Sequence, residues 1–428
     1  HRWLIGTGAM LALAVALALF GAGGEASLAE GDVIYVDADA DPGGDGATWG
    51  TAFADLQDAL DAAEAAAPVE IWVAAGTYKP TWQFDGDPRS ATFQMENGVA
   101  LDGGFAGGET ELGQRDWVAN PTILSGDLGD PNEPTDNSYH VVYSSGVTET
   151  AILDGFTISG GNANGDSWPD WDGGGMYNVY SSSPALTDVT FSGNQTVGHG
   201  GGMHNLDDSC PTLTNCLFIN NVADSDGSGS GDGGGMSNEI NSSPVLSGTH
   251  FLGNTANNGG GMHSGNESNP ELTNVSFGGN TAAADGGGMH NYPGSSPALN
   301  NVTFIGNTAG VDGGGMSNGD SSPTLTNVTF SGNTADDNGG GVYNWQGSPT
   351  LRNCILWGNE AGSAGHQISN SGGSTPTIAW SDIQGSGGSL GWDPGLGTDV
   401  GGNIDADPLL VDAAAGNLRL RRDSPAID

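Results

Sequence analysis

Short runs of alternating apolar and polar residues recur at a nearly constant interval through the middle of the chain. In the copy that spans residues 313–335, threonines and turn residues separate the apolar positions, which are Met316, Leu325, Val328 and Phe330. Such runs are typical of strands, and the Ser-Ser-Pro and Gly-Asn-Thr segments between them are typical of turns. Because no copy contains an apolar pattern of helical length, each copy predicts about three short strands.

Three landmarks keep step from copy to copy. An apolar residue follows Gly-Gly-Gly at Met176, Met203, Met236, Met262, Met289, Met316 and Val342, at intervals of 27, 33, 26, 27, 27 and 26 residues. The longest interval contains an inserted loop from Asp224 to Asp232. A large core residue recurs at Phe191, Phe218, Phe251, Phe277, Phe304, Phe330 and Leu356. An asparagine recurs at Asn254, Asn280, Asn307 and Asn333.

A copy of this length cannot bury its apolar side chains alone, whereas copies stacked in register can. Stacking predicts that Met lies on Met, Phe on Phe and Asn on Asn, with the asparagines forming an internal polar ladder. The copies lack the leucines of a leucine-rich repeat and the Gly-Gly-x-Gly-x-Asp nonapeptides of a calcium-binding β-roll, and they are too short for a propeller blade. The sequence therefore predicts an all-β right-handed parallel β-helix solenoid.

The repeat also carries a family resemblance. Gly-Gly-Gly-Met-x-Asn, followed by Ser-Ser-Pro-x-Leu-Thr-Asn-Val-Thr-Phe-x-Gly-Asn-Thr-Ala, resembles the polymorphic outer membrane protein repeat of the pectin lyase-like superfamily. Three early stretches are similar to the opening of secreted bacterial β-helix proteins: residues 34–37, 48–53 and 71–78. The resemblance implies a short capping helix at about residues 53–66, and it implies little about activity.

The chain divides into four expected segments. Arg2, the apolar run from Leu11 to Phe20 and the small residues of Ser27-Leu28-Ala29 predict an export signal, since the apolar run is short for a membrane anchor. The tail contains stretches similar to the closing motif of secreted β-helix proteins: 407–409, 417–420 and 424–428. We expect a signal peptide at 1–29, an N-terminal cap with the first coils at 30–138, repeats of about 27 residues at 139–384, and a C-terminal coil with the closing motif at 385–428.

The composition narrows the range of partners. Lys and Arg total 8 against 51 Asp and Glu, a formal net charge of -43, which argues against nucleic acid and anionic membranes and suits cations. Low hydrophobicity with high net charge is typical of disorder, but the regular apolar spacing argues against it here. The three cysteines do not form a disulfide framework: Cys216 and Cys354 take a core position, and Cys210 is expected to be a free thiol.

Because pectate lyases and polygalacturonases share this scaffold, an enzyme remains the alternative. A polyuronate lyase needs a basic side chain, and Arg352 is the only Lys or Arg between Asp116 and Leu418. Gly198-His199-Gly200 and Asp207-Asp208 resemble two polygalacturonase motifs, but their order is reversed and the family's Asn-Thr-Asp and Arg-x-Lys elements are missing. Both observations argue against catalysis.

Two loops are candidate binding sites. An aromatic and acidic loop predicts glycan contact, because exposed Trp stacks on sugar rings and carboxylates bond their hydroxyls; its residues are Asp166, Trp168, Asp170, Trp171 and Asp172. The inserted loop has the oxygen-rich, glycine-containing character that suits calcium, through Asp224, Asp226 and Asp232. For the first loop, the alternative is that Trp packs over the flank of the β-helix. For the second, the alternative is an ordinary solvated turn, since the loop does not match a full calcium-loop motif.

A histidine column is the third candidate. The residue after each core Met is expected to point outward. This position predicts exposed side chains for His204, His263 and His290. Stacked imidazoles about 4.8 Å apart are close enough to share a metal or bind a sugar. A zinc site needs three or four ligands, and Ser and Tyr occupy the same column in other copies, so a solvated column is the simpler interpretation.

Together these observations favour a secreted or surface-exposed monomer of a bacterial envelope, associated with the outer membrane, that presents loops for adhesion or contact with a polysaccharide or host-cell glycan. No catalysis is expected. The alternative is a polysaccharide lyase or glycoside hydrolase with a cleft along one face of the β-helix. An enzyme is expected to gather acids and aromatics at one height of one face, whereas a structural solenoid keeps its repeat uniform.

Overall fold

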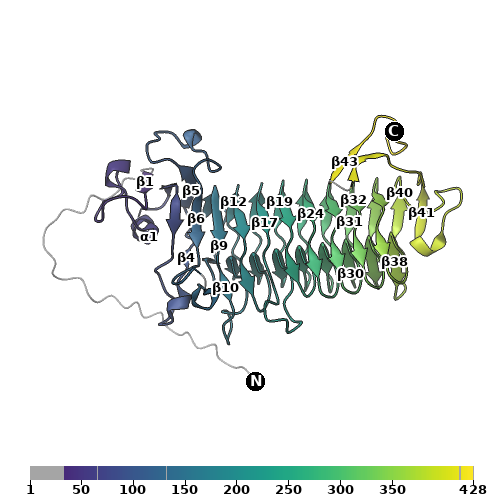
Figure 1. The fold of residues 1–428 in the computed structure, drawn as a ribbon, viewed down its shortest axis with the longest axis horizontal. Helices are drawn as coiled ribbons and strands as arrows, with labels where there is room; N and C mark the ends of the chain where they lie inside the picture. Colours follow the sequence, from purple (N-terminus) through teal and green to yellow (C-terminus); the bar gives the residue numbers. More distant parts are fainter. Residues whose placement is uncertain (1–32, 65, 132, 414–415, 428) are drawn as a thin grey trace, which may run out of the picture.

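Parallel strands stack into one long β-helix in the computed structural model, which describes residues 33–64, 66–131, 133–413 and 416–427 (Figure 1). A 13-stranded sheet runs from β1 (Val33–Val36) to β41 (Thr398–Gly401), and an 11-stranded sheet runs from β3 (Gly76–Tyr78) to β40 (Asp382–Ile383). A short five-stranded sheet runs from β21 (Thr255–Ala256) to β37 (Glu360–Ala361), and each of its strands follows the asparagine of the repeat. The predicted all-β solenoid is therefore confirmed.

The third long sheet, which we call the Met sheet, has ten strands and contains the Gly-Gly-Gly-Met positions. Its strands are β4 (Phe93–Gln94), β7 (Val142–Ser145), β11 (Met176–Val179), β15 (Met203–Leu206), β18 (Met236–Glu239), β22 (Met262–Ser264), β26 (Met289–Asn291), β30 (Met316–Gly319), β34 (Val342–Trp345) and β38 (Ile368–Ser371). Each core residue pairs with the equivalent residue of the next coil, as in Met289 with Met316 and Met316 with Val342. The predicted in-register stacking is confirmed.

The core consists of the columns that the repeat predicts. Successive Phe rings from Phe191 to Phe330 stack with centroids 4.5–4.8 Å apart and planes within 8° of parallel. The asparagine ladder lies in a buried turn, where Asn307 Oδ1 accepts hydrogen bonds from the backbone nitrogen of Asn280 at 3.0 Å and from its Nδ2 at 2.9 Å. The asparagines thus satisfy the turn backbone from one coil to the next.

The glycine triplet marks the closest approach between coils. The first glycine lies in the left-handed region, as at Gly313 with φ +71°. A Cβ on Gly314 would lie 2.3 Å from the carbonyl oxygen of Thr334 in the next coil. Any side chain at these positions would therefore separate the coils or strain the turn.

The two ends of the β-helix differ from its middle. Helix α1 (Leu56–Glu64) is shorter than the predicted range of 53–66, and it buries Leu56, Ala59, Leu60 and Ala63 against the first coil. At the other end β42 (Leu410–Asp412) and β43 (Asn417–Leu420) form an antiparallel hairpin within the predicted closing motif. The predicted signal peptide at 1–29 lies outside the described residues, among which no helix is long and apolar enough to cross a membrane.

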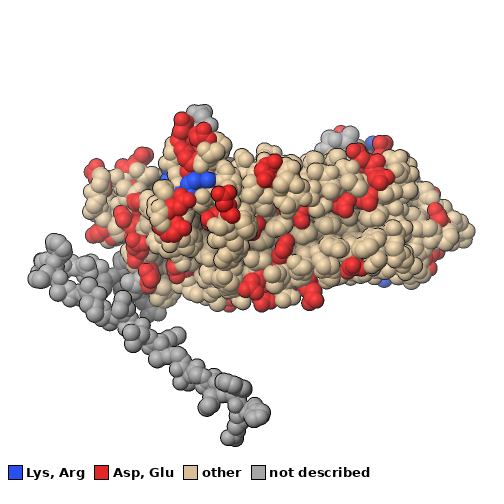
Figure 2. Space-filling view, turned by 90° about the horizontal axis from the view of Figure 1, so that it is seen from below, with Lys and Arg blue, Asp and Glu red and all other residues tan. Residues whose placement is uncertain are grey.

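The three cysteines are unpaired; Cys216 and Cys354 are buried in the core, and Cys210 is partly exposed in a turn. Acidic side chains are scattered over the face seen in Figure 2, where the largest visible group of Lys and Arg atoms lies toward the N-terminal end. Arg115 is one matched cation, because it bonds Asp154 at 2.7 Å and lies 3.7 Å from Asp102.

Candidate functional site

The outer face of the Met sheet carries two columns of side chains. The first column follows each core residue by one position: Tyr143, Tyr177, His204, Ser237, His263, His290, Ser317 and Tyr343. The second column lies two positions further: Glu239, Gly265, Tyr292, Gly319 and Trp345. Side-chain size varies within both columns, so the outer face is uneven although the backbone repeat is regular.

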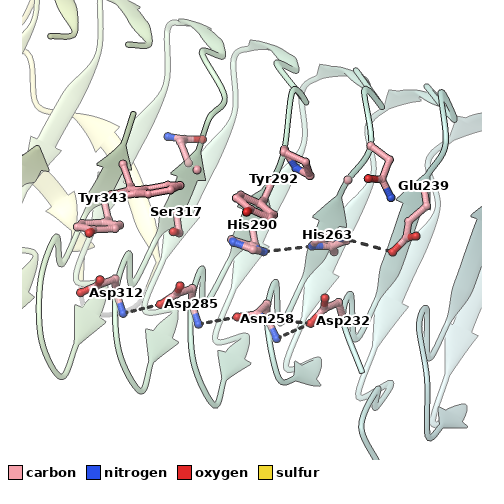
Figure 3. A pocket seen from close by; sticks show the side chains of 16 residues that line it. Asp232, Glu239, Asn258, His263, Asp285, His290, Tyr292, Asp312, Ser317 and Tyr343 are labelled. Carbon is pink, nitrogen blue, oxygen red and sulfur yellow. Dashed lines mark hydrogen bonds and ion pairs between the residues drawn. The ribbon is translucent and has the colours of Figure 1, made fainter. Parts of the chain in front are cut away.

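A groove of about 610 Å³ opens where small residues of β30 lie between large ones of its neighbours. Ser317 lies between Tyr292 on one side and Tyr343 on the other (Figure 3). Gly319 also lines the groove and pairs with Trp345 of the next coil. A Cβ on Gly319 would lie 2.5 Å from Cδ2 of Tyr292, so the glycine leaves room for the Tyr292 ring. Tyr292 is 43% exposed and Trp345 is 37% exposed. The groove therefore offers two accessible aromatic surfaces.

A ladder of polar side chains forms one wall of the groove. It lies at the turn that precedes each glycine triplet (Figure 3). This aspartate ladder consists of Asp232, Asn258, Asp285, Asp312 and Asn338. Asp232 Oδ1 accepts hydrogen bonds from the backbone nitrogen and Nδ2 of Asn258 at 3.1 and 2.9 Å. Asp285 Oδ1 accepts only a backbone hydrogen bond, from Asp312 at 3.0 Å. Two carboxylates therefore follow one another at this point of the wall.

This succession of carboxylates affects the pKa of Asp285. Burial raises the pKa of Asp285, and the charge of Asp312 raises it further. Burial raises the pKa of the Tyr343 hydroxyl, and the charge of Asp312 raises it further. The wall thus presents half-buried carboxylates whose negative charge is poorly solvated.

Beside the ladder lie a histidine pair and Glu239 (Figure 3). His263 Nδ1 lies 3.2 Å from His290 Nδ1, and His263 Nε2 lies 3.9 Å from Glu239 Oε1. Burial lowers the pKa of His263 to about 3 and that of His290 to about 3, so both rings are neutral at neutral pH. Burial raises the pKa of Glu239, although nearby His199 opposes the shift. The imidazoles therefore supply hydrogen-bonding groups but no positive charge.

The predicted exposed histidine column is wrong in its exposure. His204 is 1% exposed and His263 is 5% exposed, and only His290 is half-buried. The rings point outward as predicted, but neighbouring coils bring large side chains against them. The ring of His204 stacks on that of Tyr177, with the ring centroids 5.5 Å apart. His263 is enclosed by His290 and Glu239. The column is packed rather than solvated because the coil spacing matches the distance of stacked rings.

The predicted glycan loop is only partly assembled. Trp168 is 46% exposed and Trp171 is 37% exposed, Asp166 is exposed, and Asp170 is half-buried. Trp168 Nε1 donates a hydrogen bond to the Tyr177 hydroxyl at 3.0 Å. Asp172 is buried, which argues against the predicted contact of this residue with a glycan. Its Oδ1 accepts the backbone hydrogen bond of His199 at 2.7 Å, the same function that Asp285 has in its own coil.

An aromatic patch around this loop was missed by the sequence analysis. Phe84 is 44% exposed, and its ring centroid lies 4.5 Å from that of Tyr143. Tyr180 is 51% exposed, and its ring centroid lies 6.4 Å from that of Trp168. Phe84 comes from a segment before the repeats, so periodicity contains no signal for its position. Tyr180 was detectable, because it stands at a left-handed turn position where Asp207 and Asn266 stand in other coils.

The predicted calcium loop does not assemble in the structure. Asp224 Oδ1 accepts hydrogen bonds from the Gly229 nitrogen at 2.9 Å and the Ser228 hydroxyl at 3.1 Å, and Asp226 Oδ1 accepts one from the Ser228 nitrogen at 3.1 Å. Asp232 belongs to the aspartate ladder instead. Within the described part of the chain, no three His, Cys, Asp or Glu side chains are arranged to hold a metal ion. The loop uses its carboxylates to stabilise its own turns.

Comparison with known proteins adds a likeness of fold. No protein-family model matches the sequence, and no curated protein is similar to it, so membership in the polymorphic outer membrane protein family stays a prediction. A similar solved structure is the crystal structure of pectate lyase Pel9A, with a TM-score of 0.49 and 12% identity over 94% of this chain and 92% of that chain. These values are too low to transfer residues or activity from that lyase to this chain.

The groove itself was not predicted, although the sequence contains a signal for it. Glu239, Tyr292 and Trp345 all stand three positions after the core residue of their strand. Comparing that position across the copies would have shown large residues on both sides of Gly319. The histidines stand at a different position, directly after the core Met of their strands, and their pattern does not predict the groove.

Proposed function

We propose that this protein binds a glycan in the groove over β26, β30 and β34. The observation that carries the proposal is the pairing of two exposed aromatic side chains, Tyr292 and Trp345, with a wall of half-buried carboxylates. Aromatic faces stack on sugar rings, and carboxylate, imidazole and amide groups bond hydroxyl groups. A groove that joins both features suits a sugar chain better than a purely apolar ligand.

The position of the groove supports the proposal. Aromatic and acidic residues gather at one height of one face, which departs from the uniform repeat of a solenoid without a binding site. The loop with Trp168 and the patch with Phe84 and Tyr180 lie on the same face nearer the N-terminus. We include them as a second contact for a longer chain. With the export signal expected at 1–29, the proposal places the protein outside the cell, as an adhesion or glycan-binding protein.

A glycoside hydrolase or polysaccharide lyase is the second candidate, favoured by one observation. Glu239 is a half-buried carboxyl group whose pKa burial raises, and it lines the groove. A carboxyl group with a raised pKa is suited to general acid catalysis of glycosidic cleavage. This candidate requires a second acid or base among Asp232, Asp285 and Asp312.

A glycan array with the full chain and three variants tests the proposal. Tyr292→Ala and Trp345→Ala are each expected to weaken binding about tenfold, equivalent to ~1.4 kcal/mol of lost stacking. Trp357→Ala is the matched control, since Trp357 is a partly exposed tryptophan at the end of β36 (Ile355–Trp357) in the 11-stranded sheet. Equal binding by all four proteins would place the glycan elsewhere, and no binding would refute the proposal.

A reducing-end assay on the glycans that bind separates the two candidates. The binding protein is expected to release no new reducing ends. Release that disappears in Glu239→Gln and persists in Trp357→Ala would replace the first candidate with the enzyme.

A further inference from the structure

Three carboxylates of the groove, Asp232, Asp285 and Asp312, form no ion pair with a Lys or Arg among the described residues. The fourth, Glu239, has Oε1 4.0 Å from His199 Nε2. No Lys or Arg belongs to the lining of the groove. Arg352, the only Lys or Arg between residues 116 and 418, lies on β35 (Thr350–Arg352) in the 13-stranded sheet, away from the Met sheet. The imidazoles of the lining are neutral at neutral pH because they are buried.

Three enclosed carboxylates near the N-terminal end of the described chain have a cation beside them. Asp102 and Asp154 share the buried guanidinium of Arg115, and Asp127 lies 3.7 Å from Lys79 Nζ. Removing carboxylates from water without a counter-charge is unfavourable, so paired carboxylates are the usual arrangement. Asp285 and Asp312 depart from it, since they stand in adjacent coils with no cation between them.

We propose that the glycan bound in this groove carries free ammonium groups, as in a polymer of 2-amino-2-deoxy sugars that are not acylated. This inference rests on the proposed function and adds the charge of the ligand to it. Sugar rings stack on Tyr292 and Trp345, and ammonium groups lie against Asp285 and Asp312. An ammonium group forms charge-assisted hydrogen bonds with carboxylates, whereas a uronate chain is repelled by the same wall.

An ammonium group fits this wall better than a bare metal ion does. One oxygen of Asp232, Asp285 and Asp312 is already engaged in the ladder, through the nitrogens of Asn258, Asp312 and Asn338. Calcium needs six to eight oxygen ligands around one point. The ladder instead offers carboxylates in a line, spaced by the coil rise of about 4.8 Å. A linear array suits a polymer with several separated charges.

Isothermal titration calorimetry with oligomers of matched length tests the inference. The probes are a fully deacetylated chitosan oligomer, the chitin oligomer with the same backbone, and an oligogalacturonate with and without calcium, at mildly acidic pH and low salt. Chitosan is expected to bind about tenfold more tightly than chitin, and added salt is expected to reduce that ratio because it screens the charges. Oligogalacturonate is expected to show no binding.

Each other outcome has a definite meaning. Equal affinity for chitin and chitosan, or preference for chitin, overturns the inference and leaves the proposed function intact. Binding of oligogalacturonate, with or without calcium, also overturns only the inference. Absence of binding by every glycan overturns both. An oligolysine of equal charge that binds as tightly as chitosan would show attraction to an acidic protein, and that result also overturns the inference.

Matched variants locate the charge effect. Asp285→Asn is expected to reduce chitosan affinity about fivefold and to change chitin affinity by less than about twofold. The fold tolerates this change, because Asn258 and Asn338 occupy the same ladder position. Glu271→Gln is the control, since Glu271 is exposed on β23 (Glu271–Thr273) of the 13-stranded sheet and loses the same charge. Equal effects of both variants on chitosan binding would contradict the inference.

Discussion

Single residues decide where the regular solenoid departs from uniformity. In the aspartate ladder, Asn258 both donates to Asp232 and accepts from the backbone of Asp285. Asp285 can only accept, so the ladder loses a side-chain donor at this coil and gains a second carboxylate. The same repeat position therefore supports the turn in the coils from Asp232 to Asp312, and at Asp285 and Asp312 it also supplies charge to the groove.

Asp285→Asn is expected to stabilise the protein in the absence of ligand. The new amide can donate to Asn258 as Asn258 donates to Asp232, and the repulsion between residues 285 and 312 disappears. A gain of about 1 kcal/mol corresponds to a rise in Tm of roughly 1–2 °C for a chain of this size. Differential scanning calorimetry of both proteins at neutral pH measures the shift, and a lower Tm for the variant would contradict this account of the ladder.

The same variant predicts a pH dependence with a defined sign. The pKa of Asp285 is raised above its ordinary value of 3.8, so the folded state holds this proton more tightly than the unfolded state. The free energy of unfolding therefore falls as pH rises from the ordinary value through the raised one. The difference in Tm between variant and wild type is expected to be smallest at acidic pH and to grow toward neutral pH. A constant difference would mean that charge at residue 285 is irrelevant to stability.

At the scale of elements, short strands depend on their turns. Strands of two to four residues form few ladder bonds within a coil, and the buried asparagine turn joins coils through side chains. Asn307 illustrates this: its Nδ2 donates to the carbonyl of Phe277 at 3.0 Å and to Asn333 Oδ1 at 2.9 Å. The ladder is a structural element in its own right.

Asn307→Ala is expected to destabilise the protein by ~2–4 kcal/mol, because it leaves buried groups of Phe277 and Asn280 without partners. Chemical unfolding followed by circular dichroism measures the change. Thr308→Ala is the control, since Thr308 is exposed beside the ladder, and it is expected to stay within about 0.5 kcal/mol of the wild type. Equal stability of Asn307→Ala and the control would show that the ladder contributes little.

The elements also show what could be predicted from the sequence. Met, Phe and Asn recur at fixed intervals, and in-register stacking follows from burial alone, so the strands and core columns were predictable. The burial of His204 was not, because it depends on the ring of Tyr177 in the preceding coil. The loop at Asp224 was predicted to bind calcium from its composition, but composition does not show that its own backbone occupies the carboxylate oxygens.

At the scale of the whole molecule, stacking brings distant residues to one surface. Glu239 and Trp345 are separated by four coils in the sequence, yet they line the same groove. The period alone predicts that equivalent positions stack, and therefore a line of sites along one face. It does not predict that Gly319 leaves room for Tyr292, since this depends on the ring conformation. The fold was therefore more predictable than the site.

The net charge of -43 on this elongated surface predicts a strong effect of salt on stability. Raising sodium chloride is expected to raise Tm, because it screens repulsion among carboxylates. Calcium and magnesium chloride at equal ionic strength are expected to give equal shifts, since no cluster among the described residues is arranged for a metal. A shift that is larger with calcium alone, measured by differential scanning fluorimetry, would restore a specific calcium site.

A crystal structure of the protein with a chitosan oligomer would show whether the groove binds a glycan. We expect sugar rings against Tyr292 and Trp345, with amino groups beside Asp285 and Asp312. An oligomer bound only at the patch of Phe84 and Trp168, with the groove holding solvent, would contradict this expectation.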